Sequence, residues 1–316
     1  MKKSFLMVLF AFFVHFTYAQ KDGQTVYDFM KLPVSAHAAA LGGDNISIPD
    51  DDITMVFQNP ALITGASDKT VALQYMNYMS GCNNASAAYK SSVKEKYHFA
   101  VGATLMNYGK IQERDASNNS LGEFSANEFF ISGTLAYDLL ENLSGGVSLK
   151  YVYSNIASYS SMAVATDLGL SWYLPETEWS LALVVKNLGG QLKAYNDDFE
   201  KLPLNVQLGV TKRLVGSPLR LSATFSDLNH PDYKFWNHAC IGAELFLASN
   251  IYVGGGYNFR RASEMEIVST ENEGSSHGAG LSFGGGVSLE RFKLNVSYAK
   301  YHVSSSSIMV NVAFSL

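Results

Sequence analysis

One pattern in the sequence could carry hydrolytic chemistry. The run from Gly280 to Gly284 reads G-x-S-x-G, the pattern that presents a nucleophilic serine in many hydrolases, here Ser282. That chemistry needs a sharp strand-to-helix turn, with an acid and then a histidine later in the chain. The motif instead lies within a segment that alternates as a strand does, and no helical pattern follows it. We therefore expect no catalytic serine, and no enzymatic activity.

Metal and phosphate binding are the other candidate chemistries. The acidic run Asp50–Asp52 lacks an EF-hand pattern and favours an acidic turn or a helix start. The glycine-rich stretches lack the lysine and helix of a phosphate loop. The histidines lack the paired spacing of a metal site, at His37, His98, His230, His238, His277 and His302. We predict no metal and no cofactor.

The N-terminus indicates a secretory signal peptide. Lys2 and Lys3 precede an apolar run from Phe5 to Phe16, and small residues then offer cleavage after Ala19. The apolar run is shorter than the roughly 20 residues that a spanning helix needs. We predict a signal peptide over residues 1–19.

Composition limits the remaining possibilities. Of the 316 residues 47% are apolar and 16% charged, with a net charge of −5. Nucleic acid is an improbable partner, because its binding needs a concentrated basic face. Cys82 is predicted in a loop and Cys240 in a strand, and we expect no disulfide between them.

Alternating segments fill the chain from Thr70 to the end. In Leu204–Lys212, for example, apolar residues interleave with small or polar ones. This alternation therefore predicts that residues 70–316 form an all-β, antiparallel transmembrane barrel of about fourteen strands. The strands are predicted at Thr70–Met76, Asn84–Ser91, Tyr97–Met106, Asn127–Tyr137, Leu143–Tyr153, Ala163–Tyr173, Trp179–Lys186, Leu204–Lys212, Leu219–Phe225, Asn237–Phe246, Asn250–Phe259, Gly278–Ser288, Phe292–Tyr301 and Ser307–Leu316.

Connection lengths support a barrel over a soluble β-sandwich. The long connections Asn107–Ala126, Asn187–Pro203, Ser226–Trp236 and Arg260–His277 each follow an odd-numbered strand, as extracellular loops of a barrel do. A sandwich does not sort its loops in this way. Aromatic residues near strand ends would form the two membrane girdles, at Tyr97, Tyr137, Tyr153, Trp172, Trp179, Phe259 and Phe292.

Some strand positions that alternate with the apolar ones carry charged residues. We place these residues in the lumen, because charged side chains are costly against lipid. They are Lys150, Asp167, Lys186, Arg220, Glu244 and Lys293. Lys186 could equally lie at a strand end in the headgroup region. Repeated glycines would let the sheet bend or let another segment approach the wall, at Gly145–Gly146, Gly254–Gly256 and Gly284–Gly286.

Residues 20–69 do not alternate, and we predict that they fold inward as a plug. The plug would hold a short alanine-rich helix capped near Gly42 and Gly43 and a turn at Asn59 and Pro60.

The same segment carries a recognisable motif. It begins with L-P-V-S-A-x-A-A-A-L-G-G, which includes Leu32, Pro33, Ala36, Gly42 and Gly43, and continues with Asp51, Asp52, Asn59 and Pro60. This motif resembles the entry region of FadL-like outer-membrane barrels, most closely the PorV/PorQ group of the type IX secretion system. The resemblance is specific over residues 26–63 and general over the barrel.

The resemblance implies a fourteen-stranded barrel of Bacteroidota in the cell-surface attachment complex. Its implied partners are a PorZ-like surface protein, a PorU-like sortase and a PorV-like barrel, beside outer-membrane lipid and lipopolysaccharide. The sortase joins cargo to lipopolysaccharide, and the barrel would tether the PorZ-like protein without chemistry of its own.

Three functions remain open: a secretion scaffold, a FadL-like carrier of hydrophobic small molecules, and a porin. A carrier should have an apolar pocket, a porin an open charged lumen, and a scaffold a filled lumen with an exposed aromatic patch. Our candidate for partner contact is Tyr233, Phe235 and Trp236, although the last two could equally begin a membrane girdle.

Overall fold

A computed structural model describes residues 25–316 except 80, 95, 270–271, 276–277 and 303–304. The predicted signal peptide and its cleavage after Ala19 lie outside the described residues. Within them, no helix is long and apolar enough to cross a membrane.

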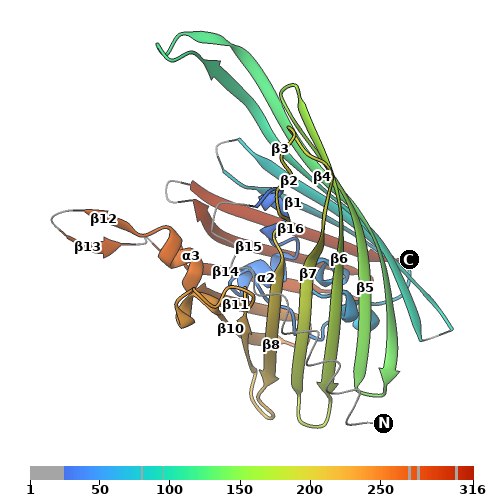
Figure 1. Cartoon of the computed structure of the whole chain (residues 1–316). Helices are drawn as coiled ribbons and strands as arrows, with labels where there is room; N and C mark the ends of the chain where they lie inside the picture. The colour runs from blue at the N-terminus through green and yellow to red at the C-terminus, as the bar shows by residue number, and fades with distance from the viewer. Residues whose placement is uncertain (1–24, 80, 95, 270–271, 276–277, 303–304) are drawn as a thin grey trace.

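Within the described residues, fourteen antiparallel strands close into one barrel, with β1 paired to both β2 and β16 (Figure 1). This confirms the predicted fold class. The strands are β1 (Thr70–Asn77), β2 (Asn83–Val93), β3 (Tyr97–Arg114), β4 (Ser120–Leu140), β5 (Leu143–Ile156), β6 (Tyr159–Leu174), β7 (Trp179–Lys193), β8 (Asn205–Arg213), β9 (Leu219–Phe225), β10 (Ala239–Ala248), β11 (Ile251–Asn258), β14 (Leu281–Ser288), β15 (Phe292–His302) and β16 (Ser305–Ser315). A separate small hairpin is formed by β12 (Ile267–Ser269) and β13 (Asn272–Ser275).

The alternation in the sequence sorts side chains between the two faces of the wall. In β1 the burial alternates at every residue, so that Ala72 is 1% exposed and Leu73 beside it 59%. The outward apolar side chains suit a lipid environment, and the inward face carries small and polar residues. The predicted lumen charges are buried on this inward face, except Lys293, which is half-buried near one end.

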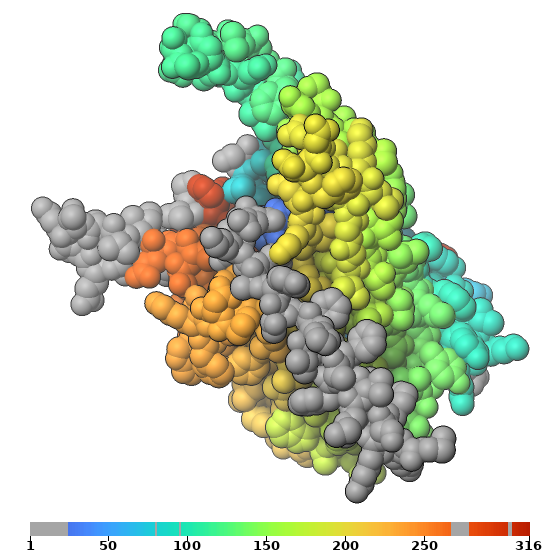
Figure 2. Space-filling model, viewed as in Figure 1, coloured from blue at the N-terminus to red at the C-terminus, as the bar shows by residue number. Residues whose placement is uncertain are grey.

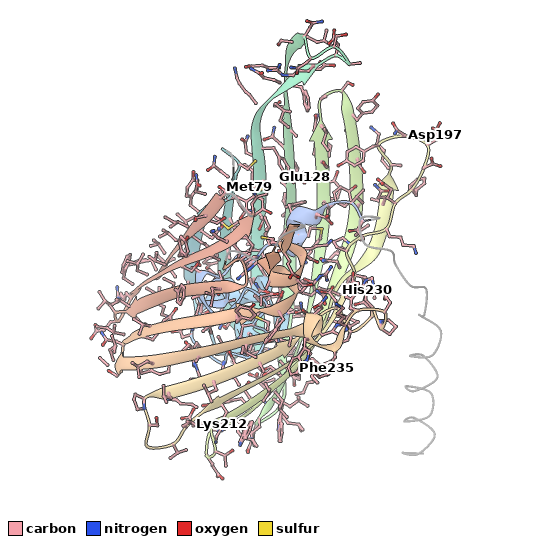
Figure 3. The ribbon with its side chains drawn as sticks, turned by 90° about the vertical axis from the view of Figure 1, so that its left-hand side faces the viewer. Met79, Glu128, Asp197, Lys212, His230 and Phe235 are labelled. Carbon is pink, nitrogen blue, oxygen red and sulfur yellow. The ribbon has the colours of Figure 1, made fainter. Side chains whose placement is uncertain are left out.

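The barrel has two different ends. We call the end with the connections after β1, β3, β5, β7, β9, β11 and β15 the loop end, and the opposite end the turn end. Figure 3 shows Asp197, in the β7–β8 connection, at the loop end and Lys212, near the end of β8, at the turn end. The long connections predicted from the sequence all lie at the loop end.

Several predicted boundaries are wrong at the loop end. The expected connection over 107–126 is mostly strand, because β3 and β4 continue as a paired hairpin beyond the wall. Figure 2 shows this extension standing clear of the rest of the molecule. Similarly, β7 continues to Lys193. Outside the membrane neither face of a strand needs to be apolar, so the alternation that marks the other strands is absent there.

The remaining boundary errors concern residues around two short helices. Asn237 belongs to the 3-10 helix η4 (Phe235–His238) rather than to β10. Phe259 begins the helix α3 (Phe259–Glu264) rather than ending β11, so this predicted girdle residue lies outside the strands. Gly278 has a positive φ and lies in a turn before β14.

Residues 25–69, which we call the lumen segment, pack against the inward face of the wall. The amide of Val26 donates to Lys201 O at the loop end, whereas Lys293 Nζ donates to Asp51 O at the turn end. The segment therefore runs the length of the barrel. It contains η1 (Asp28–Lys31), α2 (Ala36–Ala40), η2 (Ile53–Phe57) and η3 (Pro60–Gly65).

The predicted alanine-rich helix is present as α2. Ser35 caps it by accepting a hydrogen bond from Ala38 N, and Gly42 and Gly43 leave it with φ of 107° and 105°. Those angles favour glycine. The predicted turn at Asn59 and Pro60 is instead the start of η3, with Asn59 as its N-cap.

Candidate functional site

An arginine of the wall joins the lumen segment to two neighbouring strands. Arg220 of β9 donates to both Asp50 oxygens at 2.6 Å, and to the two oxygens of Glu244 on β10 at 2.7 and 2.9 Å. His37 of α2 lies on the same Glu244 carboxylate, with 2.6 Å between Nε2 and Oε1. Bidentate pairing of this kind fixes both distance and orientation.

These contacts stabilise the charged forms of the two groups from the lumen segment. Burial alone would raise the pKa of Asp50, but the Arg220 guanidinium beside it holds that pKa at about 2. Burial would lower the pKa of His37, but the Glu244 carboxylate outweighs it and raises the pKa above its ordinary value. The cluster therefore holds the segment by charge as well as by shape.

A second ionic cluster lies at an irregularity in the wall. Lys150 Nζ is 2.5 Å from Asp167 Oδ2 and donates to Asn187 Oδ1 at 3.0 Å. Asn187 has a φ of 60° and lies where the register between β6 and β7 shifts. Its backbone N–H donates to Asp167 Oδ1. Lys150 and Asp167 thus provide hydrogen-bond partners for Asn187 at this bulge in the wall. Lys186 reaches the lumen segment instead, donating to Gln58 Oε1 at 3.3 Å.

The predicted family-motif residues hold the lumen segment in place. Asp52 caps η2 by accepting from Thr54 N, and Asp51 pairs with Lys293. Asn59 caps η3 and donates to Ile46 O and Leu170 O. The helix start favoured for the acidic run is present at Asp52, whereas the pairing of Asp50 with Arg220 was not predicted.

The other motif residues pack closely. Ala36 N donates to Asn311 of β16, and Leu32 packs against two buried apolar clusters. Pro60 lies against Gly146 and Gly169, and Pro33 and Gly43 line a cavity at the loop end.

Wall glycines allow this close approach. A Cβ at Gly256 would lie 2.1 Å from the backbone carbon of Leu41, and one at Gly146 would lie 2.5 Å from that of Pro60. Of the two reasons expected for the glycine repeats, close approach applies at these positions.

The hydrolase-like pattern forms part of the packing. Ser282 is fully buried in β14, and its hydroxyl donates to Ala40 O and Gly256 O. Cys82 lies in the β1–β2 connection and Cys240 in β10, and both are free thiols. In the described part of the chain, no group of three or more His, Cys, Asp or Glu side chains could hold a metal ion.

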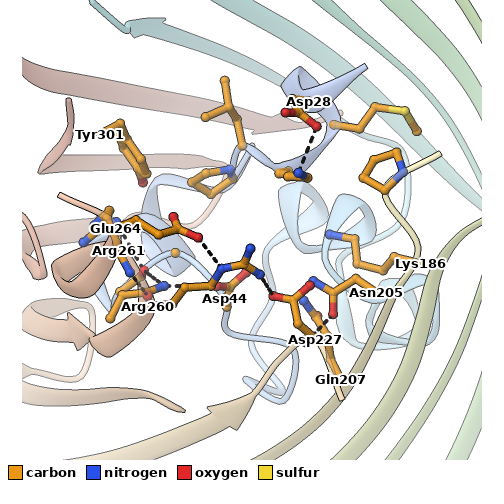
Figure 4. Close-up of a pocket in the computed structure, with 18 of the residues that line it drawn as sticks. Asp28, Asp44, Lys186, Asn205, Gln207, Asp227, Arg260, Arg261, Glu264 and Tyr301 are labelled. Atoms are coloured by element: carbon orange, nitrogen blue, oxygen red, sulfur yellow. Dashed lines mark hydrogen bonds and ion pairs between the residues drawn. The ribbon is translucent and has the colours of Figure 1, made fainter. Parts of the chain in front are cut away.

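A cavity of about 540 Å³ opens at the loop end between the lumen segment, β7, β8 and α3 (Figure 4). Its lining includes four acidic and four basic side chains. Arg260 occupies the middle, paired with Asp227 at 2.5 Å and with Glu264 at 2.5 Å. The charged residues are Asp28, Lys31, Asp44, Lys186, Asp227, Arg260, Arg261 and Glu264.

Aromatic side chains gather beside this cavity. Phe235 and Trp236 of η4 are 65% and 63% exposed, and Trp236 packs on Phe259 with 5.7 Å between ring centroids. Tyr233 is different, because it stacks on His230 at 4.9 Å and lies under the Arg260 guanidinium. Of the three candidate contact residues, Phe235 and Trp236 face outward and Tyr233 supports the loop.

No family model matches the chain, and no curated protein matches it in sequence. Several solved structures match it in fold. The toluene transporter TodX of Pseudomonas putida matches with a TM-score of 0.54 at 12% identity, covering 89% of this chain and 97% of TodX. The monoaromatic hydrocarbon channel CymD gives 0.57 at 14%, covering 90% and 97%. A FadL homologue of Pseudomonas aeruginosa gives 0.54 at 8%, covering 90% and 98%.

The chain therefore has the fold of these FadL-like outer-membrane β-barrels. The similar structures are channels and transporters by name.

Proposed function

We propose that this chain is a non-enzymatic barrel of the type IX secretion attachment complex that holds a surface protein at its loop end. The main observation behind the proposal is the outward aromatic pair Phe235 and Trp236, whose rings pack on Phe225 and Phe259. Exposed aromatic side chains on an ordered support are typical of binding hot spots.

The packing of the lumen segment on the barrel wall supports this proposal. Aromatic and aliphatic side chains of the lumen segment, among them Phe29 and Phe57, pack on Phe130 of the wall. The loop-end cavity is lined by charged side chains, whereas carriers of hydrophobic molecules need an apolar pocket. A scaffold needs no path through its lumen.

The leader motif supports a particular member of that complex. Its residues, from Leu32 to Pro60, resemble PorQ, and in this chain they hold the lumen segment against the wall. The partner at the loop end would then be a PorZ-like surface protein, with a PorU-like sortase and a PorV-like barrel in the same complex, surrounded by outer-membrane lipid and lipopolysaccharide.

The second candidate is a FadL-like carrier of hydrophobic small molecules. The fold shared with TodX and CymD favours it, because those proteins are named as a toluene transporter and a monoaromatic hydrocarbon channel. The structural comparisons support this function more directly than they support the secretion complex. The charged lining of the loop-end cavity argues against it.

One experiment separates the two functions. The tagged chain is purified from its own outer membrane in mild detergent, and both co-purifying proteins and extracted small molecules are identified. Recovery of a large PorZ-like or sortase-like surface protein supports the scaffold. A solitary barrel carrying a fatty acid or a hydrocarbon contradicts the scaffold and supports the carrier.

A pair of variants locates the contact. Replacing Phe235 and Trp236 together by alanine should reduce partner recovery at least about tenfold, as expected of hot-spot side chains. The matched control is Val215→Ala, since Val215 is an exposed apolar residue at the turn end, 76% exposed. Equal recovery with the double variant and the control would exclude η4 as the contact.

A further inference from the structure

The loop-end cavity carries two charges that are not matched by ion pairs, one half-buried and one buried. Asp28 pairs with Lys31, and Arg260 with Asp227 and Glu264. Arg261 is different again, because its guanidinium donates to backbone carbonyls of Gly42, Ala279 and Gly280. Asp44 and Lys186 remain, and neither makes an ion pair within the described ranges.

Hydrogen bonds satisfy Asp44 and Lys186 only in part. Lys186 is 8% exposed, and its ammonium donates to Gln58 at 3.3 Å. Asp44 accepts a hydrogen bond from Asn258 Nδ2 at 3.1 Å. The buried Lys186 charge, with a single partner, costs free energy that an oppositely charged group would offset, and the half-buried Asp44 carboxylate has room for a further donor.

A third side chain of the cavity lining also lacks a hydrogen-bond partner. Gln207 of β8 is 1% exposed, and its Oε1 has no hydrogen-bond partner among the described residues. An amide oxygen accepts hydrogen bonds, so Gln207 calls for a donor in the cavity. The cavity therefore offers a carboxylate and an amide oxygen for a donor group, and an ammonium for an acceptor group.

We propose that the loop-end cavity binds a small zwitterion, of the α-amino acid class, between Asp44, Gln207 and Lys186. The ammonium of the ligand donates to the Asp44 carboxylate and Gln207 Oε1, and its carboxylate accepts from Lys186 Nζ. A zwitterion adds no net charge to a lining whose four acidic and four basic side chains already balance. The volume of about 540 Å³ lies within the range of small-molecule sites.

The titration of Asp44 agrees with this assignment. Burial raises the pKa of the Asp44 carboxyl, and the nearby Asp227 raises it further, against Lys186 and Arg261. A ligand ammonium would stabilise the ionised carboxylate. This inference does not depend on which of the two proposed functions is correct.

Calorimetry with three matched probes tests the proposal on the folded full chain in detergent. L-alanine carries both charges, propionate only the carboxylate, and ethylammonium only the ammonium. We expect L-alanine to bind, and each singly charged probe to bind at least about tenfold more weakly, because each loses a charge-assisted hydrogen bond. No binding of L-alanine, or equal binding of either singly charged probe, would overturn the proposal.

Two near-isosteric variants assign the groups. Asp44→Asn and Lys186→Gln should each weaken L-alanine binding at least about tenfold. Lys110→Gln, on the exposed extension of β3 and β4, should leave it unchanged. Heat-modifiable gel mobility checks the folding of each variant, and Asp44→Asn alone decides the outcome if Lys186→Gln does not fold. Unchanged affinity in a folded Asp44→Asn variant would refute the assignment.

Discussion

Arg220 contacts one carboxylate from the lumen segment and one from the wall. Because Asp50 lies 170 residues away from it in sequence, this contact fixes two distant parts of the chain to each other. Removing one member of such a cluster leaves the remaining buried charges uncompensated, which typically costs about 3–5 kcal/mol. The acidic run of the leader is thus a structural feature of the barrel.

The lowered pKa of Asp50 predicts acid sensitivity. Its folded pKa of about 2 lies below the unfolded value of about 3.9, so its contribution is complete above about pH 5 and is lost as pH falls through about 2. The side chain is 33% exposed, and after allowance for solvent screening we expect about 1–2 kcal/mol. Urea unfolding in micelles, followed by tryptophan fluorescence between pH 2 and 6, measures this loss.

Asp50→Asn should remove that part of the pH dependence. Asp198→Asn, in the exposed β7–β8 connection, serves as the control and should reproduce the wild-type curve. If Asp50→Asn unfolded with the same pH profile as the wild type, the pairing with Arg220 would contribute nothing measurable. His37 has the opposite sign, because its raised pKa adds stability that is lost as pH rises through it.

Alternation in the sequence predicted which charges face the lumen, including Arg220 and Glu244, because lipid excludes charge from the other face. It could not predict their partners. A strand pattern gives the face of a residue but not which lumen residue lies at the same depth. The pairing of Asp50 with Arg220 and the bulge at Asn187 depend on that missing information.

At the scale of elements, the wall and the lumen segment fit each other through backbone contacts. Where α2 ends, Leu41 and Gly42 lie against Gly256 of β11, and a side chain there would overlap the backbone of both. Such an overlap cannot be relieved by a rotamer change, so the segment or the strand must move.

Gly256→Ala should therefore loosen the lumen segment. We expect a loss of about 1–3 kcal/mol from overpacking, and faster protease cleavage within residues 25–69. Gly133→Ala is the matched control, since a Cβ at Gly133 of β4 meets no atom within 4 Å. Limited proteolysis with mass spectrometry measures the effect. Identical cleavage rates in the two variants would contradict the close packing of α2.

The short helix α2 was predictable, because a serine before an alanine run and two glycines after it favour a helix with these two ends. The extension of β3 and β4 was not predictable from alternation. Its residues face water on both sides, and Leu121 is 62% exposed there. In that environment no burial pattern distinguishes a strand from a loop.

At the scale of the whole molecule, the barrel and its lumen segment form one packed body. We expect the full chain in a planar bilayer to conduct few ions. Deletion of residues 25–65 should raise single-channel conductance at least about tenfold, since conduction needs a continuous water path. Deletion of 115–119, in the extension outside the wall, is the control and should change nothing. High conductance of the full chain would show that the segment leaves an open path.

The route of the lumen segment sets an order of events in biogenesis. Its helix α2 contacts β14, β15 and β16, whereas η3 contacts β3, β4, β5 and β6. Because the segment touches both the early and the late strands, we expect it to dock before β1 pairs with β16, so that the last seam closes around it.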